Sequence, residues 1–331
     1  MENDLVPRAG YELKTIDAYG LSKKLTLENF KKMCKTLKGF KEAKKIIQDF
    51  KPDIVIGTGG YICGATIWEA NKLKIPTMLH ESNAFPGKAV KMLAKKTDTI
   101  MVSFEDAIPR IDSKNKIVCT GTPVKNQKRD YTVEEKNEII KKAGLKSGKP
   151  IVLIFGGSQG AQKINEAIVE IIKQKENKEY QIMWATGPKQ YDIVKEKLEE
   201  NRISINNVEN AKIVPYIYNM EEMINISDLI VARSGAMTIT EIANLGKPSI
   251  LIPLPNVSHN HQLYNAQVLE KIGAAKIILD NELKGENLQK TIMQILQGNT
   301  AKTMGKNALK AETKDAEDRI YSEIVQLVRK E

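Results

Sequence analysis

The pattern of apolar and polar positions is clearest in the middle of the chain. Residues 151–155 form a short apolar run between Pro150 and Gly156, which predicts a strand buried on both faces. Apolar residues then recur at helical spacing through 161–172 and predict a helix. The turn between them, residues 156–160, has the sequence Gly-Gly-Ser-Gln-Gly. Such a turn presents backbone N–H groups and the positive end of a helix dipole at one place, which suits a phosphate or a diphosphate.

Two other segments repeat this order of strand, glycine turn and helix. Residues 53–56 run into Gly-Thr-Gly-Gly-Tyr at 57–61, and a helix is predicted to follow. Residues 228–232 run into Arg-Ser-Gly-Ala at 233–236, again before a predicted helix. Three such units predict an α/β protein with parallel sheets whose carboxyl ends bind phosphorylated ligands. Further strands are predicted at 75–83, 99–103, 116–120, 180–187, 212–216, 248–253 and 275–279.

The N-terminal part contains an amphipathic segment rich in lysine. Residues 1–7 predict a short helix, residues 11–15 alternate as an exposed strand would, and residues 27–50 predict a long helix with one apolar face. This face either packs on the sheet while the lysines are solvated, or is exposed at its N-terminal end and touches anionic lipid. The candidate membrane-facing residues are Phe30, Lys31, Lys35, Leu37 and Phe40.

Composition narrows the classes of function. The 331 residues leave room for two domains, and 41% hydrophobic with 28% charged residues is typical of a globular protein. The net charge is +10, but a nucleic-acid partner is not expected, because aromatic residues make up only 5% of the chain and no recognition motif accompanies the lysines. Three separated cysteines and three histidines give no metal-ligand spacing, so neither a metal nor another cofactor is predicted. The sequence also shows no signal-peptide pattern and no apolar run of membrane-spanning length.

Five motifs together resemble the MurG family of transferases, which belongs to glycosyltransferase family 28. They are Gly57-Thr58-Gly59-Gly60-Tyr61, His80-Glu81-Ser82-Asn83, and the segments 156–161, 233–241 and 261–266. The resemblance covers essentially the whole chain, and the ordered set is specific although each motif alone is not. It implies a GT-B fold, an α/β architecture in which two Rossmann-like domains with parallel sheets face each other across a cleft. Residues 1–124 are then the acceptor-binding domain, with 315–331 packing back on it, and residues 125–314 are the UDP-sugar donor-binding domain.

The resemblance also implies roles for residues of the donor domain. Ser158 and the glycines beside it hold the donor diphosphate, and Glu241 accepts hydrogen bonds from both ribose hydroxyls. Gln262 recognises the sugar hydroxyls, and His261 stands where a second glutamine is familiar. Tyr216 and Ile217 match the segment that covers the uracil. The full donor-binding set is Gly157, Ser158, Gln159, Gly160, Tyr216, Ile217, Ser234, Gly235, Ala236, Glu241, His261 and Gln262.

On the acceptor side, the implied residues are fewer. Gly59 and Gly60 match a loop that faces the acceptor diphosphate, and Tyr61 and Asn83 complete the set. The general base is not identified, and the candidates are His80 and Glu81. The family begins with a strand and a Gly-Gly-Thr-Gly-Gly-His loop, which this sequence does not contain. The N-terminal domain is therefore expected to be incomplete.

The implied reaction is the inverting transfer of N-acetylglucosamine from UDP-N-acetylglucosamine to the 4-hydroxyl of undecaprenyl-diphospho-muramoyl-pentapeptide. This is a step of peptidoglycan synthesis, carried out by a peripheral protein at the cytoplasmic face of the cell membrane.

Two alternatives stay open. In the first alternative, this chain lacks the first glycine loop and is a non-catalytic subunit that binds a UDP-sugar without turnover. Residues 156–160 also fit the G-x-S-x-G elbow of serine hydrolases, with Ser158 as nucleophile and Asp228 and His259 or His261 following in order. The hydrolase interpretation leaves the other two glycine units unexplained and offers no second oxyanion donor.

Overall fold

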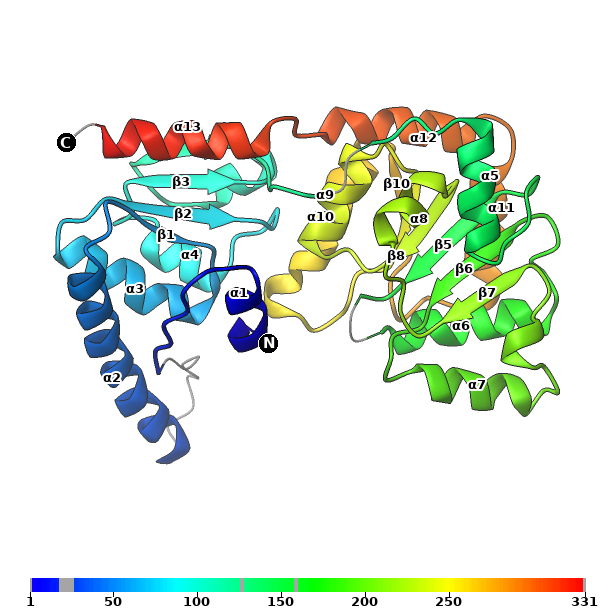
Figure 1. Cartoon of the computed structure of the whole chain (residues 1–331), viewed down its shortest axis with the longest axis horizontal. Helices are drawn as coiled ribbons and strands as arrows, with labels where there is room; N and C mark the ends of the chain where they lie inside the picture. Colours follow the sequence, from blue (N-terminus) through cyan, green and yellow to red (C-terminus); the bar gives the residue numbers. More distant parts are fainter. Residues whose placement is uncertain (1, 18–26, 126–127, 158–159, 330–331) are drawn as a thin grey trace. The chain divides into compact units, whose positions relative to one another are not determined.

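The computed structural model describes residues 2–17, 27–125, 128–157 and 160–329 (Figure 1). The chain divides into two compact units. The first consists of Met1–Ser82, Pro86–Thr120 and Ala316–Glu331. The second consists of Asn83–Phe85 and Gly121–Asp315, so three residues of the N-terminal half are counted with the C-terminal half.

The first unit contains a four-stranded parallel sheet whose strands lie in sequence order, β1-β2-β3-β4. The strands are β1 (Val55–Gly57), β2 (Thr77–Glu81), β3 (Thr99–Val102) and β4 (Lys116–Cys119). All residues of β2 and β3 are buried, as expected for parallel strands covered on both faces. Gly57 is required by close packing, because a Cβ there would lie 2.1 Å from the Cys63 sulfur of the following helix.

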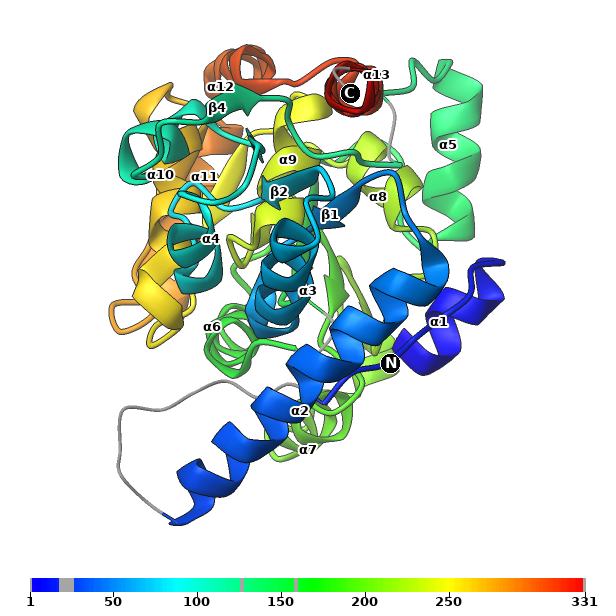
Figure 2. The same cartoon turned by 90° about the vertical axis from the view of Figure 1, so that its left-hand side faces the viewer.

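The first unit also contains helices. They are α1 (Glu2–Arg8), α2 (Leu27–Phe50), α3 (Gly60–Lys72), α4 (Lys88–Leu93), the 3₁₀ helix η1 (Glu105–Arg110) and α13 (Ala316–Val328). The long helix α2 packs along α3, and its first turns extend beyond α3 (Figure 2). The C-terminal helix α13 contacts β3, and Lys116 of β4 forms an ion pair with Glu323 of α13.

One predicted element of this unit is wrong. Residues 11–17 form no strand. Tyr11 is 73% exposed, and its backbone N–H donates to the carbonyl oxygen of Val6 at the end of α1 instead of to a neighbouring strand. The alternation at 11–15 therefore does not mark a face that the fold buries, which is the condition under which period-two patterning specifies a strand.

The second unit contains a six-stranded parallel sheet in the order β10-β9-β8-β5-β6-β7. The strands are β5 (Ile151–Phe155), β6 (Gln181–Ala185), β7 (Ala211–Val214), β8 (Leu229–Ala232), β9 (Ser249–Leu251) and β10 (Ala275–Ile277). The first strand, β5, is central. The chain builds β6 and β7 on one side of it and then crosses to build β8, β9 and β10 on the other. This is the strand order of a Rossmann fold, with its switch point between β5 and β8.

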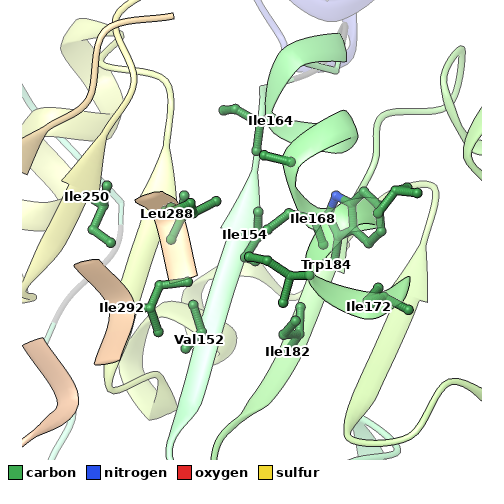
Figure 3. Close-up of a cluster of buried hydrophobic side chains, with 14 of the residues drawn as sticks. Val152, Ile154, Ile164, Ile168, Ile172, Ile182, Trp184, Ile250, Leu288 and Ile292 are labelled. Atoms are coloured by element: carbon green, nitrogen blue, oxygen red, sulfur yellow. The ribbon is translucent and has the colours of Figure 1, made fainter. Parts of the chain in front are cut away.

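The helices of the second unit connect these strands. They are α5 (Val133–Lys142), α6 (Gln162–Lys173), α7 (Tyr191–Glu199), α8 (Met220–Ile226), α9 (Ala236–Asn244), α10 (His261–Lys271), α11 (Gly285–Leu296) and α12 (Thr300–Ala308), with 3₁₀ helices η2 (Ile205–Asn207), η3 (Ser258–Asn260) and η4 (Leu309–Ala311). Figure 3 shows the core that β5 and β6 form with α6 and α11 on one face of the sheet. Trp184 at its centre is fully buried, and its indole N–H donates to Asn165 Oδ1 at 3.1 Å.

Candidate functional site

The switch point of the second sheet brings together two of the three glycine motifs. The turn after β5 and the turn after β8 follow neighbouring parallel strands, so both leave the sheet at its carboxyl edge. In open α/β sheets this edge, at the point where strand order reverses, is where ligands bind. Two segments that are about 75 residues apart in sequence are thus placed side by side by the topology.

Two glycines of the turn after β5 have backbone angles that favour glycine. Gly157 and Gly160 have φ angles of +81° and +78°, which L-residues with side chains rarely adopt. A Cβ on Gly160 would lie 2.5 Å from the Thr186 carbonyl oxygen. Among the described residues, none has an atom within 4 Å of a Cβ placed on Gly157. The predicted residues Ser158 and Gln159 lie outside the described residues.

The turn after β8 leads directly into α9, whose N-cap is Gly235 and whose first residue is Ala236. Glu241 lies in the second turn of this helix and is partly buried. Burial raises the pKa of the Glu241 carboxyl above its ordinary value, because desolvation disfavours the charged form. A carboxylate kept partly out of water can form stronger hydrogen bonds with hydroxyl groups than an exposed one.

The start of α10 is tied to the β8–α9 turn by a hydrogen bond. The buried Ser234 hydroxyl donates to the carbonyl oxygen of Gln262 at 2.7 Å, so this hydroxyl is used inside the protein. The Gln262 side-chain Oε1 accepts a hydrogen bond from the backbone N–H of Leu254 at 2.9 Å. This contact orients the amide, whose Nε2 group is a hydrogen-bond donor. His261 precedes Gln262 as the first residue of α10 and is partly buried.

Asn265 was not predicted as a site residue, yet it joins these turns to the 83–85 segment. Its side chain is fully buried, and Nδ2 donates to the Ser234 carbonyl oxygen and to Asn83 Oδ1, each at 3.1 Å. Its Oδ1 accepts the backbone N–H of Ala84 at 2.9 Å. The available signal was a polar residue in the helical register of buried positions on α10, beside Ala266 and Leu269.

The predicted uracil-covering residues follow β7. Ile217 is buried, whereas Tyr216 is about half exposed, and its ring meets the Tyr218 ring edge-on with centroids 5.1 Å apart. Because the sheet is parallel, this segment also leaves it at the carboxyl edge. It lies two strands away from β5, since β6 stands between β5 and β7.

The predicted acceptor residues gather at the carboxyl ends of β1 and β2, which are neighbours in the first sheet. Gly59 and Gly60 have φ angles of +91° and +80° at the N-terminus of α3, and a Cβ on either would meet no atom of the described residues within 4 Å. His80 and Glu81 end β2 and are both buried. The Glu81 carboxylate accepts the backbone N–H of Gly87 at 2.7 Å.

The other two predicted acceptor residues are described only in part. The Tyr61 side chain lies outside the part that the structure describes. Asn83 is counted with the second unit, where its Oδ1 accepts the hydrogen bond from Asn265.

The predicted membrane-facing residues lie on α2. Leu37 is 60% exposed and Phe40 is partly buried. The side chains of Phe30, Lys31 and Lys35 lie outside the description. None of the helices described is long and apolar enough to cross a membrane. Among all residues that the structure describes, no three His, Cys, Asp or Glu side chains form a group that could bind a metal ion.

The position of Asp228 does not fit the acid of a serine-hydrolase triad. Asp228 lies immediately before β8, and its carboxylate accepts the backbone N–H of Ile151 at 2.8 Å. Ile151 begins β5, whereas the 156–160 turn follows its end. A five-residue strand is about 16 Å long, so Asp228 is at the wrong edge of the sheet to support a base beside Ser158.

Comparison with known proteins identifies the family. The model of the glycosyltransferase family 28 C-terminal domain matches residues 151–320, and that of the N-terminal domain of the same family matches residues 1–102. The chain belongs to glycosyltransferase family 28. Family 28 membership makes it a glycosyltransferase, and the predicted α/β class with two parallel sheets is confirmed.

Individual members of family 28 are similar over nearly the whole chain. The UDP-N-acetylglucosamine–N-acetylmuramyl-(pentapeptide) pyrophosphoryl-undecaprenol N-acetylglucosamine transferase of Thermoanaerobacter sp. is 44% identical, over 97% of this chain and 87% of the relative. The enzyme of the same name from Lactobacillus gasseri is 43% identical, over 99% and 88%. Among solved structures, MurG of Acinetobacter baumannii superposes with a TM-score of 0.76 at 26% identity, covering 100% of this chain and 88% of that one.

Proposed function

We propose that this glycosyltransferase moves N-acetylglucosamine from UDP-N-acetylglucosamine to undecaprenyl-diphospho-muramoyl-pentapeptide, a step of peptidoglycan synthesis. The observation that carries the proposal is the 44% identity to a relative of that name over 97% of the chain. The geometry supports it, because the second unit offers the two kinds of group that a nucleotide diphosphate requires. These are a glycine turn after β5 and a partly buried carboxylate on the helix that follows β8, the strand beside β5.

In the proposed reaction, the donor diphosphate lies against the backbone N–H groups after β5 and the N-terminus of α6. Negative charge grows on this diphosphate as the glycosidic bond breaks, so donors already oriented toward it lower the barrier. The acceptor hydroxyl attacks the anomeric carbon from the side opposite the diphosphate, which inverts its configuration. The bond between the anomeric carbon and the diphosphate oxygen breaks, UDP leaves with its electron pair, and the hydroxyl proton passes to a general base. Glu241 holds the ribose and Gln262 the sugar, and both fix the anomeric carbon in position.

The acceptor is attached to a lipid, so the proposal also includes a peripheral position at the cytoplasmic face of an anionic membrane. Large apolar side chains are exposed on α3 and α4, two helices that pack against each other: Ile62 (50%), Trp68 (36%) and Met92 (80%). Lysines accompany them, and Lys96 Nζ lies 3.4 Å from the centroid of the Trp68 ring. Exposed apolar groups flanked by cations are the combination that favours binding at an anionic lipid surface.

The experiment that tests the proposed function measures donor binding and sugar transfer separately. We expect the chain to bind UDP-N-acetylglucosamine and to transfer labelled sugar to a short-chain analogue of the lipid acceptor. Glu241→Ala should weaken donor binding at least about tenfold, because two charge-assisted hydrogen bonds are lost. The matched control is Glu286→Ala, an exposed helical glutamate at the start of α11.

Three results would change this proposal. Failure of the unmodified chain to bind any uridine nucleotide would overturn it. Binding without transfer would support the non-catalytic subunit instead. Equal affinity of the Glu241→Ala and Glu286→Ala variants would remove Glu241 from the site while leaving the reaction itself open to the transfer assay.

A further inference from the structure

Residues 83–85 form a short segment, here called the strap, that leaves the first unit and is counted with the second. The chain enters it from β2, which ends at Glu81, and returns to the first unit at Pro86, shortly before α4. All three residues of the strap contact α10 or the turn before it, through the side chain or the backbone. Through these contacts, the strap belongs to the second unit although its neighbours in sequence belong to the first.

Asn265 fastens the first two residues of the strap. Its amide makes three hydrogen bonds, to Asn83 Oδ1, to the Ala84 N–H and to the Ser234 carbonyl oxygen, at 2.9–3.1 Å. Asn265, Ser234 and Ala84 are each fully buried. Loss of the Asn265 side chain would therefore leave the Ala84 N–H and the Ser234 carbonyl oxygen without a hydrogen-bond partner, because water does not reach them. The same Ser234 donates its hydroxyl to the Gln262 carbonyl oxygen. The strap is thus connected through Asn265 and Ser234 to the residue predicted to contact the donor sugar.

Phe85 supports the turn that precedes α10. Its ring stacks on the Tyr264 ring at a centroid distance of 4.6 Å and on the His259 ring at 5.5 Å. His259 and Asn260 are consecutive residues in the left-handed region, with φ of 56° and 51°. This conformation is unfavourable for residues with a side chain, so it persists only where neighbouring contacts hold it. The stacked Phe85 ring is such a contact.

We propose that the strap is a positioning element for donor-sugar recognition. Asn265 and Phe85 hold the Ser258–Gln262 turn so that the Gln262 amide faces the sugar of the bound nucleotide. The inference rests on the proposed function, because it assumes a nucleotide sugar at the switch point. It goes further by assigning roles to Asn265, Ala84 and Phe85. None of these three is proposed to touch the reacting atoms.

The test compares binding of UDP and of UDP-N-acetylglucosamine by calorimetry in the full-length chain. The variants are Asn265→Ala, which removes all three hydrogen bonds, and Phe85→Leu, which removes the stacked ring. Phe85→Tyr keeps the ring and serves as the conservative rescue. The matched control is Asn177→Ala, because Asn177 is also buried and its Nδ2 also donates to backbone oxygens, those of Glu209 and Asn210. Thermal unfolding of every variant measures the structural cost.

We expect Asn265→Ala and Phe85→Leu to weaken UDP-N-acetylglucosamine binding about tenfold while UDP binding changes less than about threefold. In the transfer assay, the donor KM should rise more than kcat falls. Phe85→Tyr should stay near the unmodified protein, and Asn177→Ala should lower the melting temperature without changing the ratio of the two affinities. Should Asn265→Ala fail to fold, Phe85→Leu and its Tyr counterpart decide.

Proportional losses of UDP and UDP-N-acetylglucosamine affinity would overturn the positioning role, as would an unchanged ratio of the two in Phe85→Leu. Failure of the unmodified protein to bind either nucleotide would instead count against the proposed function. The two failures are therefore distinguishable.

Discussion

Glu241 is the side chain in which burial and chemistry oppose each other. Its position on α9 withdraws it partly from water, and this desolvation raises the pKa of its carboxyl. The proposed role needs the ionised form, because only a carboxylate can accept hydrogen bonds from two ribose hydroxyls without giving up an acceptor oxygen to a proton. The residue thus works as a nucleotide ligand only above its raised pKa.

This opposition predicts how nucleotide binding depends on pH. Since the pKa of Glu241 lies above the ordinary glutamate value of 4.5, the carboxyl is protonated, and binding lost, as the pH falls through a range above 4.5. We expect UDP affinity to be full near neutral pH and to decrease on acidification, measured by calorimetry. Glu241→Gln, which cannot ionise, should bind weakly and show a flatter profile over the same range. A variant profile parallel to that of the unmodified protein would assign the pH dependence to another group.

Single residues also show what sequence reasoning could reach. Glu241 and Gln262 were predicted from the resemblance of the segments 233–241 and 261–266 to family 28, and their roles stay predictions. Asn265 was not, because its role depends on Asn83 and Ala84, which are about 180 residues distant in sequence. Ser234 was named, but the inward direction of its hydroxyl followed only from its contact with Gln262. Long-range hydrogen bonds of this kind leave no periodic signal in the chain.

Among the elements, the strand β5 was predicted with its exact bounds. The strand was predicted at 151–155 and is Ile151–Phe155, because a buried parallel strand bounded by proline and glycine has few alternative registers. The failure at 11–15 has the opposite cause, since those residues alternate without a buried face to fix them. Elements were predictable where apolar residues are enclosed on both sides.

The two positive-φ glycines of the turn between β5 and α6 should respond differently to substitution. Alanine at 157 meets only conformational strain, which costs about 1–2 kcal/mol of unfolding free energy. Alanine at 160 adds a clash with the Thr186 carbonyl oxygen 2.5 Å away, so the total should reach about 3 kcal/mol or more. Urea unfolding of Gly157→Ala and Gly160→Ala measures both values. Equal losses of unfolding free energy would mean that the backbone moves to relieve the clash. The contact with the Thr186 carbonyl oxygen would then not contribute to the cost of Gly160→Ala.

For the whole molecule, three repeated glycine units predicted parallel sheets and the family resemblance implied two domains, but the local pattern did not give the order of strands. The order around β5 depends on which way each connection crosses the sheet, and local pattern does not determine it. Neither did the pattern indicate that residues 83–85 would be counted with the second unit. Chain topology is decided by packing of complete elements, and the switch point becomes visible only when that packing is known.

The net charge of +10 and the exposed side chains on α3 and α4 predict how the whole protein behaves at a membrane. We expect it to bind vesicles containing phosphatidylglycerol and not purely zwitterionic ones, as measured by co-sedimentation. Added salt should weaken this binding, because ionic screening reduces the attraction between lysines and anionic headgroups. The Ile62→Ser and Met92→Ser double variant should reduce binding about tenfold, since two apolar groups no longer enter the interface.

The matched control for this last prediction is Tyr321→Ser, which removes a side chain that is 68% exposed on α13. Loss of vesicle binding in this control equal to that in the double variant would show that binding depends on general surface hydrophobicity and not on α3 and α4. Binding that is unaffected by salt would contradict the electrostatic part. The apolar part is contradicted separately, by a double variant that still binds fully at low salt. Because the donor turns belong to the second unit and α3 and α4 to the first, the double variant should keep its affinity for UDP.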